Sequence, residues 1–176
     1  MRLANFGGKD RLDWRPVVTS TRNLPKLVDG LDRPLKSDDE ETDLVTVATN
    51  VNSMLGPSGL TIVISDWWTR EPDIAAKAFG RSGRELVAIQ LLAPEEEDPR
   101  LLVEGWARLT DAESGDMLDL SLEAEAHAAY LDELGSWREK LGTGIEEVGG
   151  RLFTMRTDRD VSEVLHGDLQ RAGLLG

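Results

Sequence analysis

The architecture of this chain follows from three apolar stretches: LTIVIS at residues 60–65, ELVAIQLL at 85–92 and RLFTMR at 151–156. Each stretch is short and rich in aliphatic or β-branched residues. Such runs are typical of strands that are buried on both faces of a parallel sheet. We therefore predict three buried strands and read the rest of the chain around them.

Helical periodicity fills the segments between these strands. The clearest case starts at Leu44 and continues to Leu55, where Thr42 or Asp43 can cap the start and Gly56-Pro57 ends it. Further helices are predicted over about 24–31, 72–79, 122–148 (with Leu131, Leu134, Leu141, Ile145 and Val148 facing inward) and after Asp160. Strands that alternate with helices indicate an α/β fold with a mostly parallel sheet covered on both faces.

Two segments depart from this alternation. Around Gly7-Gly8-Lys9-Asp10, apolar residues on both sides of the turn predict an N-terminal β-hairpin. Around DAESGD at 111–116, the apolar faces of 103–110 and MLDL at 117–120 predict a second, small antiparallel hairpin.

Length and charge limit the classes of function. With 176 residues the chain suits one domain, 1–176, and its formal net charge of −13 argues against nucleic acid and anionic membranes as partners. The chain has no cysteine, which excludes disulfides and thiolate sites. It has no apolar run near the ~20 residues of a membrane span, so we expect no membrane insertion by this chain and a cytoplasmic location.

Ligands of parallel sheets bind at the carboxyl ends of the strands, which directs attention to Asp66, immediately after LTIVIS. Its carboxylate is either functional or a loop acid. Thr42 and Asp43 either cap the following helix or direct oxygen atoms at the same edge. Trp67 and Trp68 either form an exposed anchor for a partner or fold over the sheet edge as core. His127 and His166 are interpreted as surface or satisfied histidines.

Several segments in order resemble a bacterial and archaeal family called "domain of unknown function fifty-eight", whose C-terminal part is von Willebrand factor A-like. The similar segments are FGGKDRLDW, TDL at 42–44, TIVISDWW, LVAIQLLAPEE, LTDAESGD, AYLDELGSWREKL and the threonine-aspartate after RLFTMR. The resemblance covers nearly the whole chain.

The resemblance implies a three-layer Rossmann-like fold with a metal-ion-dependent adhesion site. Thr42 and Asp66 match two parts of that site. The Asp-x-Ser-x-Ser loop that supplies the other part is absent, and so is the family's first strand. We therefore expect an N-terminally incomplete domain whose metal site, for Mg²⁺ or Mn²⁺, needs ligands supplied upstream. Family members are often membrane-anchored upstream of this region.

Our hypothesis is a protein-interaction module rather than an enzyme. The resemblance suggests a MoxR-type AAA+ ATPase as the partner, with Thr42 and Asp66 at the metal position and Asp43, Trp67 and Trp68 contacting the partner. One alternative is a metal-dependent hydrolase that uses Asp66 at the sheet edge. Another is a fragment without independent activity.

Overall fold

A computed structural model describes residues 1–7, 11–20, 22, 25, 42–81, 83–101, 106–110, 117–121 and 124–173. At its centre is a three-stranded parallel sheet in the order β3-β4-β7. The strands are β3 (Leu60–Ser65), β4 (Glu85–Leu92) and β7 (Arg151–Arg156). The three predicted strands are confirmed, and their parallel pairing is continuous in register.

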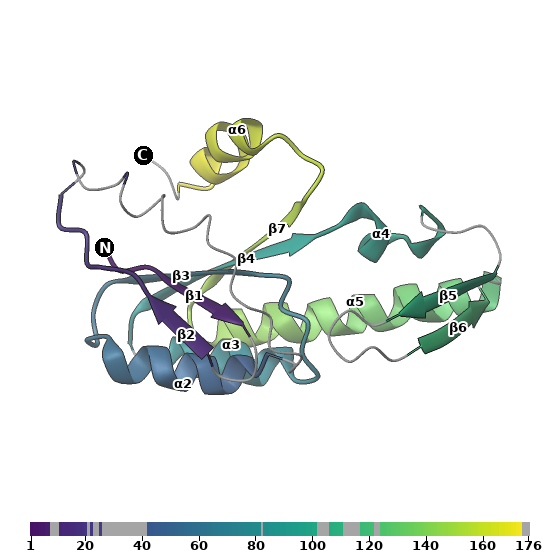
Figure 1. Cartoon of the computed structure of the whole chain (residues 1–176), viewed down its shortest axis with the longest axis horizontal. Helices are drawn as coiled ribbons and strands as arrows, with labels where there is room; N and C mark the ends of the chain where they lie inside the picture. The colour runs from purple at the N-terminus through teal and green to yellow at the C-terminus, as the bar shows by residue number, and fades with distance from the viewer. Residues whose placement is uncertain are drawn as a thin grey trace.

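Three helices cover one face of this sheet: α2 (Leu44–Met54), α3 (Pro72–Gly80) and α5 (Ala124–Glu147). The main hydrophobic core lies between them and the sheet and includes Val47, Phe79, Leu86, Leu141 and Ile145. The other face carries α6 (Val161–Glu163), which continues as the π-helical segment η3 (Val164–Leu169) (Figure 1). The prediction of a mixed α/β fold with a parallel sheet is therefore confirmed.

Local capping chemistry fixes two of the helix starts. Asp43 Oδ1 accepts hydrogen bonds from the backbone N–H groups of Val45 and Thr46 at 3.0 and 3.1 Å, which identifies the N-cap of α2. Asp160 caps α6 in the same way. Both aspartates satisfy backbone donors that have no partner inside the helix.

Both predicted hairpins are present. β1 (Ala4–Gly7) pairs antiparallel with β2 (Arg11–Trp14), and β5 (Trp106–Thr110) pairs antiparallel with β6 (Met117–Ser121). Between β4 and β5 lie the short helix α4 (Pro94–Glu97) and the 3-10 turn η2 (Pro99–Leu101). The helix predicted over 24–31 and the turn at 111–116 fall outside the described residues, apart from residue 25.

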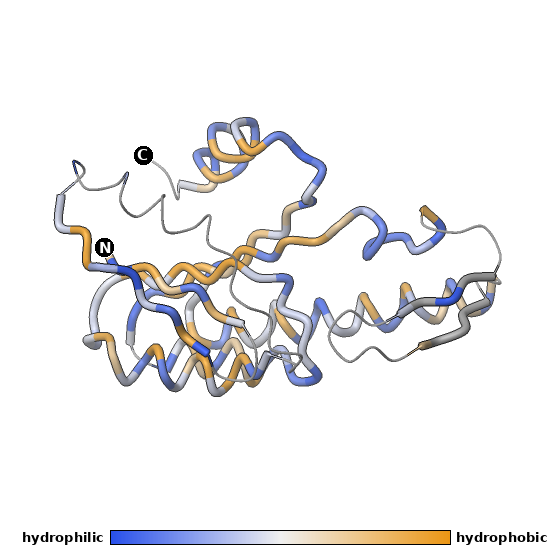
Figure 2. The backbone as a smooth tube through the Cα atoms, viewed as in Figure 1, coloured by the Kyte–Doolittle hydropathy of each residue, from blue (hydrophilic) through white to orange (hydrophobic). Residues whose placement is uncertain are grey.

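One expectation about the sheet is wrong. β3 is not buried on both faces, because its outward side chains Leu60, Ile62 and Ile64 are 49%, 49% and 55% exposed. Their neighbours on β4, Val87 and Ile89, are buried together with Met155 of β7 beneath Val164 and Leu169 of η3. The short C-terminal helix thus covers β4 and β7, whereas the outward row of β3 remains about half exposed. Figure 2 shows in orange the apolar residues along the backbone of the central strands.

Leu131 is a second exception, since it is 41% exposed although the helical pattern predicts that it faces the core.

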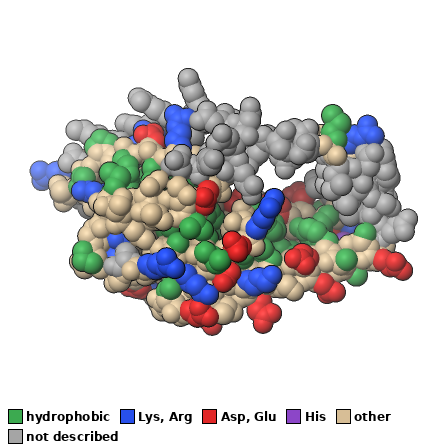
Figure 3. All heavy atoms as spheres, turned by 90° about the horizontal axis from the view of Figure 1, so that it is seen from below, with side chains coloured by type: hydrophobic (Ala, Val, Ile, Leu, Met, Phe, Trp, Pro, Cys, Tyr) green, Lys and Arg blue, Asp and Glu red, His purple; other side chains and the backbone are tan. Residues whose placement is uncertain are grey.

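No helix in the described part of the chain is both long enough and apolar enough to span a membrane. Seen from the side of α2, α3 and α5, acidic and basic side chains are interspersed over the surface (Figure 3).

Candidate functional site

The loop that follows β3 has an unusual backbone conformation. Trp67 has φ = +64°, and it is the only non-glycine residue with positive φ among the described residues. The left-handed region costs an L-residue roughly 1–2 kcal/mol, and bulky residues rarely adopt it. The consequence is geometric: Trp67 is fully buried, whereas Asp66 and Trp68 on either side of it are exposed.

Several contacts keep Trp67 in this conformation. Its indole ring packs edge-on against Phe79 at a centroid distance of 5.7 Å. Its backbone N–H donates to Ser65 Oγ at 3.1 Å. The carbonyl oxygen of Asp66 accepts a hydrogen bond of 3.3 Å from Nε2 of Gln90, whose side chain is fully buried. The core and β4 therefore offset the cost of the strained turn.

Gln90 also connects the strands to one another. Its Oε1 accepts a hydrogen bond of 3.0 Å from the hydroxyl of Thr154 on β7. One buried amide thus bridges the carboxyl ends of β3, β4 and β7. Because a buried polar group is costly unless it is paired, this bridge fixes the relative positions of the three strand ends.

Trp68 is held at the surface by two long-range contacts. Its indole Nε1 donates to Glu96 Oε1 of α4 at 2.8 Å, and its ring lies 4.7 Å from that of Trp137 on α5. Trp137 in turn donates from Nε1 to the carbonyl oxygen of Thr69 at 2.9 Å. The Trp68 ring is 37% exposed, so it presents a fixed aromatic surface.

Asp66 presents its carboxylate beside that ring. Its Oδ1 accepts hydrogen bonds from the Ser65 hydroxyl at 3.2 Å and from the Trp68 backbone N–H at 3.1 Å. No hydrogen bond to Oδ2 is found among the residues that the structure describes. An oriented carboxylate with one unengaged oxygen can accept a hydrogen bond from a cationic or N–H group of a ligand.

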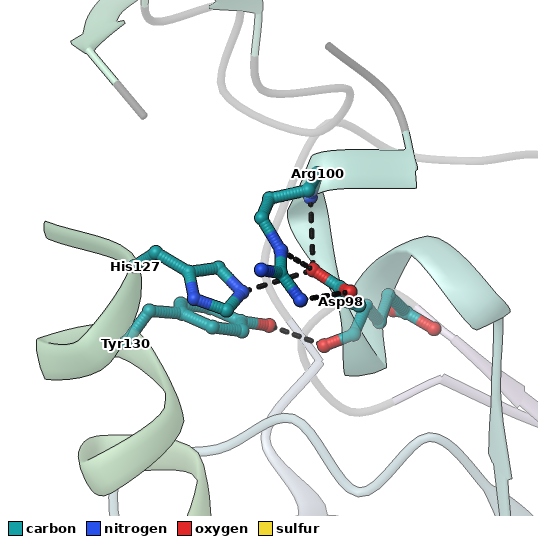
Figure 4. A network of polar contacts seen from close by, with 5 residues as sticks. Asp98, Arg100, His127 and Tyr130 are labelled. Carbon is teal, nitrogen blue, oxygen red and sulfur yellow. Dashed lines mark hydrogen bonds and ion pairs between the residues drawn. The ribbon is translucent and has the colours of Figure 1, made fainter. Parts of the chain in front are cut away.

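A polar network anchors the segment after β4 to α5 (Figure 4). Asp98 accepts hydrogen bonds of 2.9 and 2.8 Å from the Arg100 guanidinium, and its Oδ1 lies 2.9 Å from His127 Nε2. The Tyr130 hydroxyl donates to the carbonyl oxygen of Glu96. The segment that supports Trp68 is therefore tied to the N-terminal half of α5.

Charge and burial perturb two groups in this network. The hydrogen bonds from Arg100, followed by that of His127, hold the pKa of Asp98 well below its usual range. Burial raises the pKa of Tyr130, and the nearby Glu96 carboxylate contributes to the same shift. Asp98 therefore remains an anion at all ordinary pH values, and Tyr130 remains a hydrogen-bond donor.

The predicted site residues separate into different roles. Asp43 is used as a helix cap, where its Oδ2 also accepts from the Thr46 hydroxyl at 2.7 Å. Trp67 belongs to the core, which is one of the two alternatives that the sequence left open, because the left-handed turn directs its ring inward. Asp66 and Trp68 remain together at the surface. No hydrogen bond joins Thr42 to Asp66 within the described part.

The described residues do not fit a metal ion. Nowhere among them do three or more His, Cys, Asp or Glu side chains gather in a group that could hold one. Thr42 and Asp66 supply one hydroxyl and one carboxylate, whereas Mg²⁺ requires a near-octahedral set of oxygen ligands. We therefore assign no step of the function to a metal.

Sequence reasoning missed the residues that support the site. The sequence pattern places Gln90 in an apolar strand and Trp137 in a helix without giving either a role. A lone amide in a buried strand is nevertheless a signal of a polar bridge. The interpretation of His127 as a surface or satisfied histidine names no partner. Its partner Asp98 lies 29 positions away in an acidic loop, and no local pattern pairs them.

Comparison with known proteins places the chain in context. The family described as "Protein of unknown function DUF58" matches residues 4–138. No curated protein matches the sequence significantly. A crystal structure of the conserved hypothetical protein BatB from Bacteroides thetaiotaomicron is similar, with a TM-score of 0.52, 14% identity and coverage of 98% of this chain and 78% of that chain.

An uncharacterized membrane spanning protein from Vibrio fischeri has a TM-score of 0.31 at 15% identity, covering 98% of this chain and 76% of that chain. The similarity to BatB supports the mixed α/β fold. Neither comparison assigns a residue or an activity.

Proposed function

The chain belongs to the DUF58 family of proteins of unknown function, and we propose that it is a protein-interaction module that binds its partner at the carboxyl end of β3. The observation that carries the proposal is the strained conformation of Trp67. Backbone strain persists only where the surrounding structure enforces it, and it concentrates at functional sites. Here the strain separates one buried tryptophan from the displayed pair Asp66 and Trp68.

The displayed pair has the chemistry of a protein anchor. Tryptophan is enriched among the residues that dominate binding energy at interfaces, because it combines a large apolar area with a hydrogen-bonding edge. Trp68 is already held by Glu96 and Trp137, so little conformational entropy is lost when a partner binds. Asp66 beside it favours a partner with an arginine or lysine next to an apolar side chain.

The arrangement of polar groups favours binding over turnover. A hydrolase would need an activated water and a positioned base, and in the described part of the chain no three His, Cys, Asp or Glu side chains gather in a group that could hold a metal ion. The buried His127 is already paired with Asp98, which also receives the guanidinium of Arg100. These contacts account for His127 as a support of the α4 segment. We therefore propose a binding protein and not an enzyme.

The partner we propose is a MoxR-type AAA+ ATPase, which the family resemblance suggests. The test is the affinity of the purified chain for the purified MoxR-type ATPase of the same organism, by biolayer interferometry. We expect Trp68→Ala to weaken binding more than tenfold, as expected for an anchor worth more than ~1.4 kcal/mol. Asp66→Asn keeps the side-chain shape and should weaken binding through lost charge.

Leu165→Ala is the matched control, because Leu165 is 38% exposed, close to the 37% of Trp68, and lies on η3. It should leave the affinity within about threefold of wild type. Melting temperatures of all variants verify that the fold is retained. Equal affinities for all variants, or no binding by the wild type, would contradict the proposal. Metal-dependent hydrolysis of phosphoester or peptide substrates that is lost in Asp66→Asn would favour the hydrolase alternative.

A further inference from the structure

The segment that follows β4 differs from the neighbouring elements in how it is attached to the protein. Residues 93–101, here called the α4 strap, contain α4 and η2, and no residue of these two elements is buried. Neither hydrophobic cluster of the described residues includes a residue of the strap. Burial of apolar surface is the main driving force of folding, so the strap lacks the attachment that holds the other elements.

Polar contacts hold the strap in place instead. Three successive carboxylates of the strap each contact a donor on another element. These contacts join Glu96 Oε1 to Trp68 Nε1 at 2.8 Å, Glu97 Oε1 to Arg138 Nη2, and Asp98 Oδ1 to His127 Nε2 at 2.9 Å. The hydroxyl of Tyr130 also donates to the backbone carbonyl oxygen of the strap at position 96 (Figure 4). Trp68 lies in the loop after β3, and the other donors lie on α5.

The strap cannot hold its shape by itself. α4 has only four residues, and isolated helices shorter than ~12 residues are marginal in water. Residues 95–98 are four consecutive acids, whose negative charges oppose one another at such short spacing. The guanidinium groups of Arg100 and Arg138 offset part of this repulsion. The closed position therefore depends on surface contacts that can be lost while the core remains intact.

The position of the strap acts directly on Trp68 through Glu96. One carboxylate oxygen of Glu96 accepts from the indole of Trp68, and the other accepts from the backbone N–H of Ala93 at 2.5 Å. Opening the strap removes the hydrogen bond to the indole. The stacking contact with Trp137 then remains, at a centroid distance of 4.7 Å. The orientation of the Trp68 ring thus depends on whether the strap is closed.

We propose that the α4 strap is a clasp that opens and closes as one unit while the sheet stays folded, and that its closed position fixes the orientation of the Trp68 ring. Local openings of this kind have lower free energies than global unfolding. A ring that is already fixed loses less conformational entropy when a partner binds. The effect on a partner rests on the proposed function, whereas the opening of the clasp does not.

Hydrogen exchange of the chain alone tests the opening. The amides to follow are those of Ala93, Asp98 and Leu101, whose N–H groups donate to acceptors within the strap. Their exchange should depend only weakly on urea, because little surface is exposed when the strap opens. The amides of Ala88 and Ile89, in the middle of β4, should show the steep urea dependence of global unfolding.

Two variants release the strap at different points. Arg138→Met removes the partner of Glu97, and His127→Phe removes a partner of Asp98. If the strap is one unit, each variant raises the exchange rates of all three strap amides by a common factor, about fivefold for the loss of one such contact. Arg159→Met is the matched control, because Arg159 forms a similarly exposed ion pair with η3. It should leave the strap amides unchanged.

The ring of Trp68 provides the second readout. Labelling with 5-fluorotryptophan gives a ¹⁹F signal for each of the five tryptophans, and Trp68→Phe identifies the signal of Trp68. Glu96→Ala removes the hydrogen bond directly and marks the signal of a released ring. The signal of the double variant Arg138→Met/His127→Phe should move from the wild-type position toward that of Glu96→Ala.

Three results would overturn the proposal. Strap amides with the same urea dependence as β4 would mean that the strap opens only in global unfolding. Exchange that rises only beside the removed contact would mean that the strap is not one unit. A Trp68 signal that stays at its wild-type position in Glu96→Ala or in the double variant would mean that the strap does not orient the ring. Both measurements use the chain without the ATPase, so the clasp and the proposed function fail separately.

Discussion

Asp98 illustrates how one side chain joins two parts of the fold. It follows α4 in sequence, yet it contacts His127 on α5 as well as its neighbour Arg100. Both contacts favour the charged carboxylate, and together they keep the pKa of Asp98 far below the value of about 3.9 for a free aspartate. The contacts of Asp98 therefore contribute to stability only while this carboxylate is ionised.

The sign of the pH effect follows from linkage. With its pKa depressed in the folded state, Asp98 binds protons more readily in the unfolded chain. Its contribution to stability is fully present above the unfolded pKa and is lost as the pH falls toward the folded pKa. We expect the melting temperature of Asp98→Asn to fall less steeply than that of wild type between about pH 5 and pH 2, where the unfolded aspartate takes up its proton.

The measurement is a series of thermal melts followed by circular dichroism across this range. Asp132→Asn is the control, since Asp132 is an exposed aspartate of α5, and it should retain the wild-type slope. The quantity compared is the slope of melting temperature against pH, because Asp98→Asn also loses an ion pair at neutral pH and so has a different melting temperature there. Parallel curves for wild type and Asp98→Asn would contradict the assigned role of the carboxylate.

At the scale of elements, the close approach of α3 and α5 depends on glycine at position 144. A Cβ atom added to Gly144 would lie 2.5 Å from Cα of Asp73 and 2.8 Å from its carbonyl oxygen. Backbone atoms of α3 cannot yield as a flexible side chain would. The helices can therefore pack only if position 144 of α5 has no side chain.

We expect Gly144→Ala to destabilise the fold by about 1–3 kcal/mol through overpacking. Gly142→Ala in the same helix is a matched control, because a Cβ there would have nothing within 4 Å. It should stabilise the fold by about 0.5–1 kcal/mol, since alanine has the higher helix propensity. Urea unfolding of both variants measures the two values, and equal effects would contradict the packing argument.

At the scale of the whole molecule, the sheet is covered unequally. α2, α3 and α5 bury one face under the main core, whereas α6 and η3 bury only the part of the other face that belongs to β4 and β7. The two described residues that match a metal site are Thr42, before α2, and Asp66, after β3. No hydrogen bond joins them within the described part of the chain.

The small number of possible ligands predicts how the melting temperature responds to added metal. A ligand at 100 times its Kd would add about 2.7 kcal/mol to the free energy of unfolding. In a domain of this size such a gain raises the melting temperature by roughly 5 °C or more. We expect no rise with millimolar Mg²⁺ or Mn²⁺ relative to EDTA, because two oxygen ligands are too few. A rise of that size would show that the chain completes a metal site.

Local patterns in the chain specify the helices and strands of this protein. Periodicity and capping residues act over a few positions, and they sufficed to predict β3, β4 and β7, the start of α2 near Asp43 and the placement of Asp66 at a strand end. Each of these features depends on neighbours in the chain, which is why a local pattern can specify it.

The roles of individual residues within these elements follow from contacts between distant parts of the chain. The sign of one φ angle sends Trp67 inward and leaves Trp68 outside, and the short reach of η3 leaves Ile62 exposed on a strand whose pattern indicates burial. The hydrogen bond that holds Trp68 in place is accepted by Glu96, 28 positions further along the chain. Contacts of this range exist only after the chain has closed on itself, so no local periodicity encodes them.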